Sequence, residues 1–332
     1  MTITPSVRRR RTLSLAAALA MAAALGLTAC GGSTEKETAS AAPTTRSIED
    51  YFDTVEIPSN PQRVIAGDSA TLGNIFALGV TPVAAAANSH SLPHHLAEQM
   101  DGVVDVREGD DINWEKVLAQ NPDLFITFAG SEGDPWNKEM YDKAAGAIPT
   151  FGYVYNYVYL EQIKKNFTEI ARALNKQDVA EARLAELDDR LAELKERVAA
   201  AGLTDKPVSV LRVGEEGWRS IRIGTSESIA FRALGIAQPK GQTKPDDFSI
   251  DISEENLDLL DSAHTLFVYV DDTAKGEQEK VESSPLWKTL PAVKAGRVHY
   301  VNSGIWNSID IDGFDLILDD IVKYFIEPAE AE

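Results

Sequence analysis

Short runs of apolar, often β-branched residues alternate with segments in which apolar residues recur at helical spacing. In the first half of the chain, the runs lie at 63–66, 80–87, 123–128 and 148–153. Residues 71–79 and 113–121 lie between them and carry apolar side chains three and four positions apart, which predicts helices. This order of strand, helix and strand predicts a mainly parallel sheet whose faces are covered by helices.

The same pattern starts again after residue 205. Strands are predicted at 208–213, 220–224, 265–270 and 297–302, and helices at 226–235, 253–260 and 312–325. The chain is therefore predicted to be an α/β protein with two similar Rossmann-like lobes. We place the N-terminal lobe at 47–175 and the C-terminal lobe at 203–327.

One long helix is predicted at 176–202, between the two lobes. The segment has no proline and no interior glycine, and its apolar seam consists of Leu184, Leu187, Leu191, Leu194 and Val198. Opposite charges four positions apart, Glu186 with Arg190 and Glu193 with Arg197, favour the helix. A coiled-coil dimer is the alternative, but the seam lasts only about two heptads, which is short for a stable isolated pair. We therefore expect a helix that joins the lobes.

The N-terminal segment has the features of an export signal. Four arginines at 8–11 precede an apolar run at 13–29, which predicts a signal peptide at 1–29. The sequence Leu27-Thr28-Ala29-Cys30 resembles the bacterial lipobox, in which the cysteine carries the lipid. The alternatives are a retained membrane helix, for which the run is short, and an ordinary signal peptide with an incidental cysteine. Both Sec and twin-arginine export fit the arginines.

Residues 30–46 follow as a predicted disordered tether, because they contain no large apolar residue.

Composition excludes several classes of function. The formal net charge is −20, and removal of the first 29 residues, which contain four arginines and no acidic residue, makes it −24. Nucleic acid is therefore not an expected partner.

Cys30 is the only cysteine, so no disulfide is available. The chain has no GxSxG, P-loop, HExxH or strand-associated GxGxxG motif, and we predict that it is not an enzyme.

Four sequence blocks carry a resemblance to a known family. They are the long predicted helix, "PQRVIAGDSATLGNIFALGVTPVAA" from Pro61, "INWEKVLAQNPDLFIT" from Ile112 and "GRVHYVNSGIW" from Gly296. In these blocks the chain, from about Pro61 to Phe325, resembles substrate-binding proteins of ABC importers for iron-siderophores and cobalamin. The resemblance implies two α/β lobes that face each other across a cleft and are joined by a single long helix.

The resemblance also implies a biological role. "VSVLRVGEEGWRSIRIG" and "GQTKPDDFSIDISEENL" are similar to the actinobacterial siderophore branch of the family. We expect a monomeric lipoprotein, anchored on the extracytoplasmic face of a cell membrane, that delivers a ferric siderophore to an ABC permease and its ATPase. The alternatives are a cobalamin or haem binder of the same family and a ligand-sensing lipoprotein without a transport role. The siderophore class stays open.

Cationic side chains are expected in the cleft, because a ferric siderophore fills the coordination sphere of its iron and presents oxygens to the protein. Arg107 lies in a loop where hydroxamate-binding family members carry a cleft arginine. Arg212 and Arg222 interrupt two otherwise apolar strands, which is unusual unless the strands border a polar cleft. The alternative is surface ion pairing, with Glu108 or Asp110 for Arg107 and with Glu215 or Glu216 for the other two arginines.

Aromatic side chains are expected as the walls of the same cleft. Trp306 lies in a loop flanked by glycine and asparagine, at a position where the family often places an aromatic against the ligand. Tyr153 is our choice among four tyrosines that alternate along 153–159. Trp218 and Phe248, in loops of the second lobe, are weaker candidates, and Trp136 is weaker still.

No metal ligands and no resident cofactor are expected. His90, His94 and His95 lie close in sequence, but no partner recurs at ligand spacing. For docking on the permease, the family uses one glutamate on each lobe, and the matching positions are Glu115 and Glu255, with Glu254 the neighbour most easily confused with the second. A glutamate in the first turn of a helix is also what the helix dipole favours.

Overall fold

The computed structural model describes residues 44–87, 92–109, 111–155, 159–244 and 248–331. The predicted signal peptide, Cys30 and most of the predicted tether lie outside these ranges. Strand β1 (Thr45–Glu49) pairs antiparallel with β2 (Thr54–Pro58). Thr45 and Arg46, the last two residues predicted as tether, therefore belong to the folded part. Within the described ranges, no helix has the length and hydropathy needed to cross a bilayer.

The N-terminal lobe is built on a five-stranded parallel sheet in the order β5-β4-β3-β8-β9. Its strands are β3 (Val64–Ala66), β4 (Ala84–Ala85), β5 (Val104–Asp105), β8 (Leu124–Gly130) and β9 (Thr150–Val154). Its helices are α1 (Ser69–Ala77), α2 (His94–Ala97), α3 (Trp114–Ala119), α4 (Lys138–Ala145) and α5 (Leu160–Leu174). A short antiparallel pair, β6 (Arg107–Glu108) and β7 (Asp111–Ile112), leads into α3.

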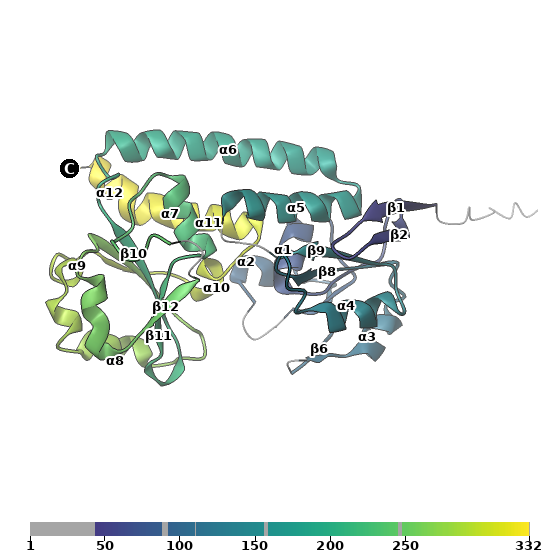
Figure 1. Ribbon diagram of the computed structural model, residues 1–332, viewed down its shortest axis with the longest axis horizontal. Helices are drawn as coiled ribbons and strands as arrows, with labels where there is room; N and C mark the ends of the chain where they lie inside the picture. Colours follow the sequence, from purple (N-terminus) through teal and green to yellow (C-terminus); the bar gives the residue numbers. More distant parts are fainter. Residues whose placement is uncertain (1–43, 88–91, 110, 156–158, 245–247, 332) are drawn as a thin grey trace, which may run out of the picture. The chain divides into compact units, whose positions relative to one another are not determined.

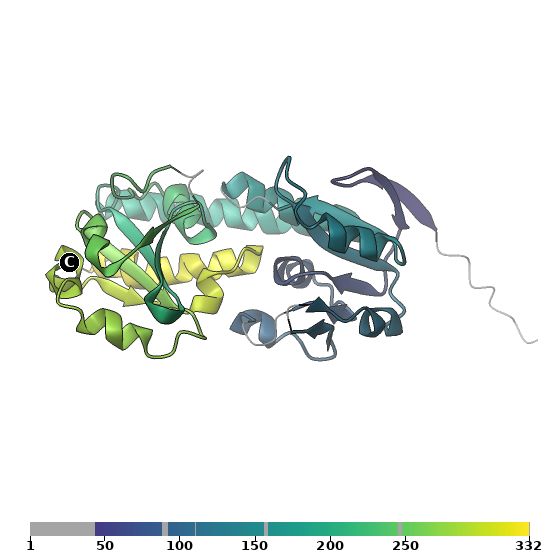
Figure 2. The ribbon, with the colours of Figure 1, turned by 60° about the horizontal axis from the view of Figure 1, so that its bottom comes forward.

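The C-terminal lobe has a five-stranded mixed sheet in the order β12-β11-β10-β13-β14. Its strands are β10 (Val208–Val213), β11 (Arg219–Arg222), β12 (Ser249–Ile252), β13 (Thr265–Val270) and β14 (Val298–Tyr300). β10, β13 and β14 run parallel, whereas β11 is antiparallel to both of its neighbours. Figure 2 shows the two sheets as separate units, one in each lobe.

The helices of this lobe fall into two groups. The longer ones are α7 (Ser226–Ala233), α8 (Glu277–Ser283) and α11 (Ile311–Ile321), which continues as the π-helical turn η4 (Val322–Ile326). The short ones are η1 (Glu215–Gly217), η2 (Glu254–Leu260), η3 (Trp287–Thr289), α9 (Pro291–Lys294), α10 (Ser303–Trp306) and α12 (Glu327–Glu330). The segment predicted as a helix at 253–260 is therefore a 3₁₀-helix.

The long helix is α6 (Gln177–Ala200), close to the predicted bounds of 176–202. It runs past both lobes beside α5 and the C-terminal helices (Figure 1). The ion pairs of the two arginines of α6 lead out of the helix. Arg190 pairs with Asp315 at 2.8 Å and Arg197 with Glu330 at 2.9 Å, so these arginines tie α6 to the C-terminal helices. The pKa of Arg197 is raised mainly by its hydrogen bond to Glu330, and the charge of Glu193, its predicted partner, adds to the rise.

The lobes are joined by more than α6. One apolar core runs through α1, α5, α6, α7 and α11, and therefore through both lobes. The start of α11 also contacts α1 directly, because the backbone N–H of Ile311 donates to the Asn74 side chain at 3.2 Å. A Cβ on Gly73 would lie 2.5 Å from Asp310 Cγ, so only glycine permits this approach without a shift. The predicted single helix is therefore the covalent connection, and packing between α1 and α11 adds noncovalent contact between the lobes.

Candidate functional site

A cavity of about 400 Å³, which we call the interlobe pocket, lies between the two lobes. Its N-terminal-lobe side is lined by Asp68, Ser69, Ala70, Pro93, Leu96, Phe128 and Tyr155, and its C-terminal-lobe side by Arg212, Asp271–Thr273, Ser303, Gly304 and Asn307–Asp310. Most of these residues follow the carboxyl ends of parallel strands, where open α/β sheets bind ligands. The volume is in the range of small-molecule clefts.

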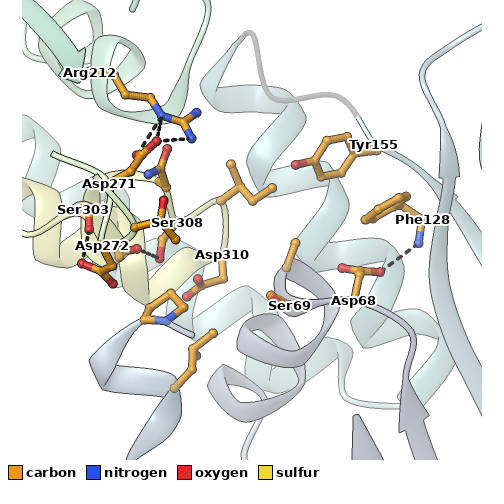
Figure 3. Close-up of a pocket in the computed structure, with 17 residues that line it drawn as sticks. Asp68, Ser69, Phe128, Tyr155, Arg212, Asp271, Asp272, Ser303, Ser308 and Asp310 are labelled. Carbon is orange, nitrogen blue, oxygen red and sulfur yellow. Dashed lines mark hydrogen bonds and ion pairs between the residues drawn. The ribbon is translucent and has the colours of Figure 1, made fainter. Parts of the chain in front are cut away.

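Aromatic rings form the wall of the pocket on the N-terminal lobe (Figure 3). Phe128 contacts Tyr155 with ring centroids 4.6 Å apart and Trp136 with centroids 5.0 Å apart. Trp136 meets Tyr155 edge to face, and about half of its surface is exposed. Phe128 and Tyr155 line the pocket, and Trp136 contacts both rings without lining it. We call these three residues the aromatic wall. Flat rings of this kind suit a bulky ligand that has an apolar body.

The guanidinium group of Arg212 lies on the opposite side of the pocket, in the C-terminal lobe, where it forms an ion pair with Asp271. The Nε–H of Arg212 donates to Asp271 Oδ1 at 2.9 Å and the Nη2–H donates to Oδ2 at 3.0 Å. The guanidinium carbon also lies 5.3 Å from the centre of the Trp218 ring. The charge of Arg212 is therefore largely balanced inside the protein, and a ligand meets an ion pair at this point.

Asp68 lies where β3 leads into α1. Its carboxylate caps the helix by accepting from the Thr71 backbone at 2.7 Å and from the Thr71 hydroxyl at 2.6 Å. It also accepts from the Phe128 backbone at 3.3 Å, so it links the helix to the strand that carries the aromatic wall. Burial raises the pKa of the Asp68 carboxyl above its ordinary value, and these hydrogen bonds oppose the rise.

The pKa of Asp68 predicts how stability depends on pH. Because the folded-state pKa is raised, this carboxyl contributes most stability below its unfolded pKa of about 4 and loses that contribution as the pH rises through the folded pKa. We expect the unfolding free energy of the wild type to fall relative to that of Asp68→Asn over this window. Urea denaturation from pH 4 to 7 measures the difference. A pH-independent difference, or one of opposite slope, contradicts the assignment.

Of the predicted arginines, the structure brings only Arg212 to the pocket. Arg222 is 5% exposed, and its Nε–H donates to Glu227 at 3.3 Å beneath the ring of Phe248. It pairs with neither of the glutamates named as alternatives. Arg107 lies in β6 and donates to the Ala86 carbonyl at 3.1 Å, and it does not line the pocket.

Two of the predicted aromatic contacts are wrong. Trp306 is fully buried, stacks on Phe267 with centroids 4.9 Å apart, and donates its Nε1–H to Asp320 at 2.8 Å. Tyr153 is 2% exposed, and its hydroxyl lies 2.9 Å from that of Thr71. Neither ring reaches the pocket surface. Burial also raises the pKa of the Tyr153 hydroxyl well above its ordinary value.

Two of the weaker aromatic candidates, Trp218 and Trp136, contact residues that line the pocket. Trp218 and Phe248 are about two-fifths exposed and cover Arg212 and Arg222, respectively. Trp136, the weakest of the candidates, belongs to the aromatic wall. Sequence reasoning missed Phe128, Asp68, Asp271, Asp272 and Asp310. An acidic residue just after a predicted parallel strand is a usable signal for Asp68 and Asp271.

The histidines form no metal centre within the described ranges, where no group of three histidine, cysteine, aspartate or glutamate side chains has metal-binding geometry. His90 lies outside the described residues. His94 is exposed, 3.6 Å from Glu98. His95 Nε2 lies 3.3 Å from Asp310 Oδ1, across the gap between the lobes.

The two predicted docking glutamates are both exposed. Glu115 lies in the first turn of α3, on the N-terminal lobe, and Glu255 lies in the first turn of η2, on the C-terminal lobe. Glu254 differs from its neighbour because it accepts a hydrogen bond from the Ser284 hydroxyl at 2.6 Å. Among the three candidates, Glu115 on the N-terminal lobe and Glu255 on the C-terminal lobe are thus exposed carboxylates for which the described contacts include no hydrogen bond.

Comparison with known proteins places this geometry in context. Residues 64–303 match the family described as periplasmic binding protein. The chain is 30% identical over 321 residues to the probable siderophore-binding lipoprotein YfiY of Bacillus subtilis, covering 91% of this chain and 94% of YfiY. It is 27% identical to the iron(3+)-hydroxamate-binding protein FhuD of the same organism, covering 86% and 88% of the two chains.

Solved structures share the fold. Staphylococcus aureus SirA, in complex with staphyloferrin B, superposes with a TM-score of 0.70 at 23% identity, covering 84% of this chain and 98% of SirA. The siderophore periplasmic binding protein from the fuscachelin gene cluster of Thermobifida fusca gives a TM-score of 0.67 at 23% identity, covering 81% and 97%.

Proposed function

Because the chain belongs to the periplasmic binding protein family, we propose that it binds a ferric siderophore in the interlobe pocket. Its family is one of binding proteins, and the chain is not an enzyme. The observation that carries the proposal is the pocket itself, a cavity of about 400 Å³ with an aromatic wall on one lobe and hydrogen-bonding groups on the other. Relatives named for binding siderophores and ferric hydroxamates support the choice of ligand.

The binding mode follows from the two sides of the pocket. The rings of Phe128 and Tyr155 would pack against the organic body of the complex. The hydroxyls and amides that line the C-terminal lobe, among them Ser303, Asn307 and Ser308, can hydrogen-bond the oxygens that surround the iron. The siderophore supplies all the ligands to the iron, so a site of this kind needs no metal-binding side chain.

A fluorescence titration tests the proposed ligand. Ferric hydroxamates, ferric catecholates, haem and cobalamin are added separately to the soluble chain from about residue 44, and tryptophan emission is recorded. We expect saturable quenching by a ferric siderophore, because Trp136 and Trp218 lie beside the pocket. Tyr155→Ala should weaken binding by about tenfold, the loss expected for one aromatic contact.

The matched control is Tyr159→Ala, which removes an exposed tyrosine that does not line the pocket and should leave affinity unchanged. Quenching by haem or cobalamin alone contradicts the proposed ligand. Equal affinities of Tyr155→Ala and the wild type contradict the proposed binding mode.

We further propose that the protein acts at the extracytoplasmic face of the membrane as a monomer anchored through lipid on Cys30. The Leu27–Cys30 sequence and relatives named as lipoproteins support this location. Delivery of the ligand to an ABC permease and its ATPase is part of the same proposal. Glu115 and Glu255, exposed on opposite lobes, are the proposed docking residues.

A further inference from the structure

The described residues that line the interlobe pocket include more acidic than basic side chains. Four of them are aspartates, Asp68, Asp271, Asp272 and Asp310, and Arg212 is the only lysine or arginine among them. Arg212 forms a two-point bond with Asp271, so this pair contributes little net charge. Three further carboxyl groups belong to the pocket lining, and they come from both lobes (Figure 3). Asp272 is exposed to a ligand, whereas Asp68 and Asp310 are 5% and 1% exposed and act on the pocket from just beneath its surface.

Neighbouring groups do not reverse this balance. Arg222 is the other arginine on the same face of the C-terminal sheet, and it is buried against Glu227. His95 lies beside Asp310 and can offset that carboxylate when protonated. The residues that the structure does not describe between 88 and 247 contain no lysine or arginine, so they cannot supply a compensating amino or guanidinium group.

We propose that the pocket selects ferric complexes by charge, accepting neutral and cationic ones and discriminating against polyanions. This inference rests on the proposed function. Three singly charged hydroxamates balance the charge of Fe(III), whereas three doubly charged catecholates leave a complex with a charge of minus three. Carboxylates repel such a trianion, while aromatic ring faces attract a cation. The expected ligand class is therefore the ferric hydroxamates, especially those with a free amino group.

The decisive experiment compares complexes that differ in charge. Tryptophan quenching gives the affinity for ferrioxamine B, which carries a protonated amine, for its N-acetylated form, which is neutral, and for the ferric enterobactin trianion. We expect ferrioxamine B to bind more tightly than the acetylated form, and the trianion to bind at least tenfold more weakly than ferrioxamine B. Raising the salt concentration should weaken ferrioxamine B alone, because salt screens its attraction to the carboxylates.

A charge variant locates the effect in the pocket. Asp272 is exposed and accepts a hydrogen bond from Ser303, which an asparagine can also accept. Asp272→Asn should therefore narrow the affinity gap between ferrioxamine B and its acetylated form by about threefold, the scale of one partly screened charge. Asp205→Asn removes an exposed aspartate that does not line the pocket and should leave the gap unchanged.

The outcomes separate this inference from the proposed function. If ferric enterobactin binds as tightly as ferrioxamine B, the charge selection is wrong although siderophore binding stands. Affinity for ferrioxamine B that is independent of salt also overturns it, and that measurement needs no variant. If none of the three complexes quenches, the proposed function is itself contradicted.

Discussion

Replacing Trp306 by alanine is expected to lower the free energy of unfolding by about 3–5 kcal/mol, the usual cost of removing a fully buried tryptophan. The ring has no exposed surface and stacks on Phe267 of β13. Its Nε1–H donates to Asp320, so the substitution also leaves a half-buried carboxylate without that donor. Urea denaturation of the wild type and Trp306→Ala measures the loss.

Two further variants test whether Trp306 acts through packing in the core or through contact with the ligand. Trp306→Phe keeps an aromatic ring on Phe267 but loses the N–H, so we expect a smaller loss of stability. Trp218→Ala removes a tryptophan that is 39% exposed and should change stability little. If Trp306→Ala instead keeps its stability and loses ligand affinity, Trp306 belongs to the binding surface, as the sequence suggested.

Trp306 shows why the sequence misplaced part of the site. The glycine and asparagine around it indicate a surface loop, but residues 303–306 form the short helix α10, which directs the ring into the core. The partner that makes this position apolar, Phe267, lies in a strand almost 40 positions earlier. The residues around Trp306 in the sequence contain no information about a contact with so distant a residue.

The tyrosines show a second limit. Alternation along 153–159 requires some of these rings to face the pocket, but it does not say which ones. The register between β8 and β9 shifts between Phe128 and Gly130, where Gly130 has a φ of 142°. Past this irregularity, Tyr155 meets Phe128 in the aromatic wall, whereas Tyr153 points to Thr71. An irregularity in strand pairing cannot be read from periodicity.

The features that were predicted correctly have strong local signals. Continuous apolar runs predicted the buried parallel strands, and the long segment without proline predicted α6. The sequence also led to the position of Arg212 at the pocket, because a charge at the end of an apolar strand must reach a polar environment. Its contact with a ligand stays a prediction. Its partner Asp271 was not found, because ion pairing depends on which strands become neighbours, and β10 and β13 are separated by more than 50 residues.

The second large effect concerns delivery of the ligand. Combining Glu115→Ala with Glu255→Ala is expected to abolish uptake of the ferric siderophore by cells while leaving its affinity for the isolated protein unchanged. Both carboxylates are exposed, one on each lobe, and neither lines the interlobe pocket. Removing one partner of a charge pair that becomes buried in an interface costs about 2–5 kcal/mol, so two losses together should reduce docking by several orders of magnitude. Uptake of radiolabelled iron measures the effect.

The matched control for this experiment is Glu254→Ala, since Glu254 adjoins Glu255 in the same turn but is already bonded to Ser284. We expect it to retain uptake, which distinguishes a specific docking position from a general loss of negative charge on a chain with a net charge of −20. Each single variant should transport at an intermediate rate, because one lobe can still dock while the other is free. Normal uptake by the double variant contradicts the docking assignment and leaves ligand binding unaffected, since the carboxylates that face the ligand lie in the pocket and not on these two helices.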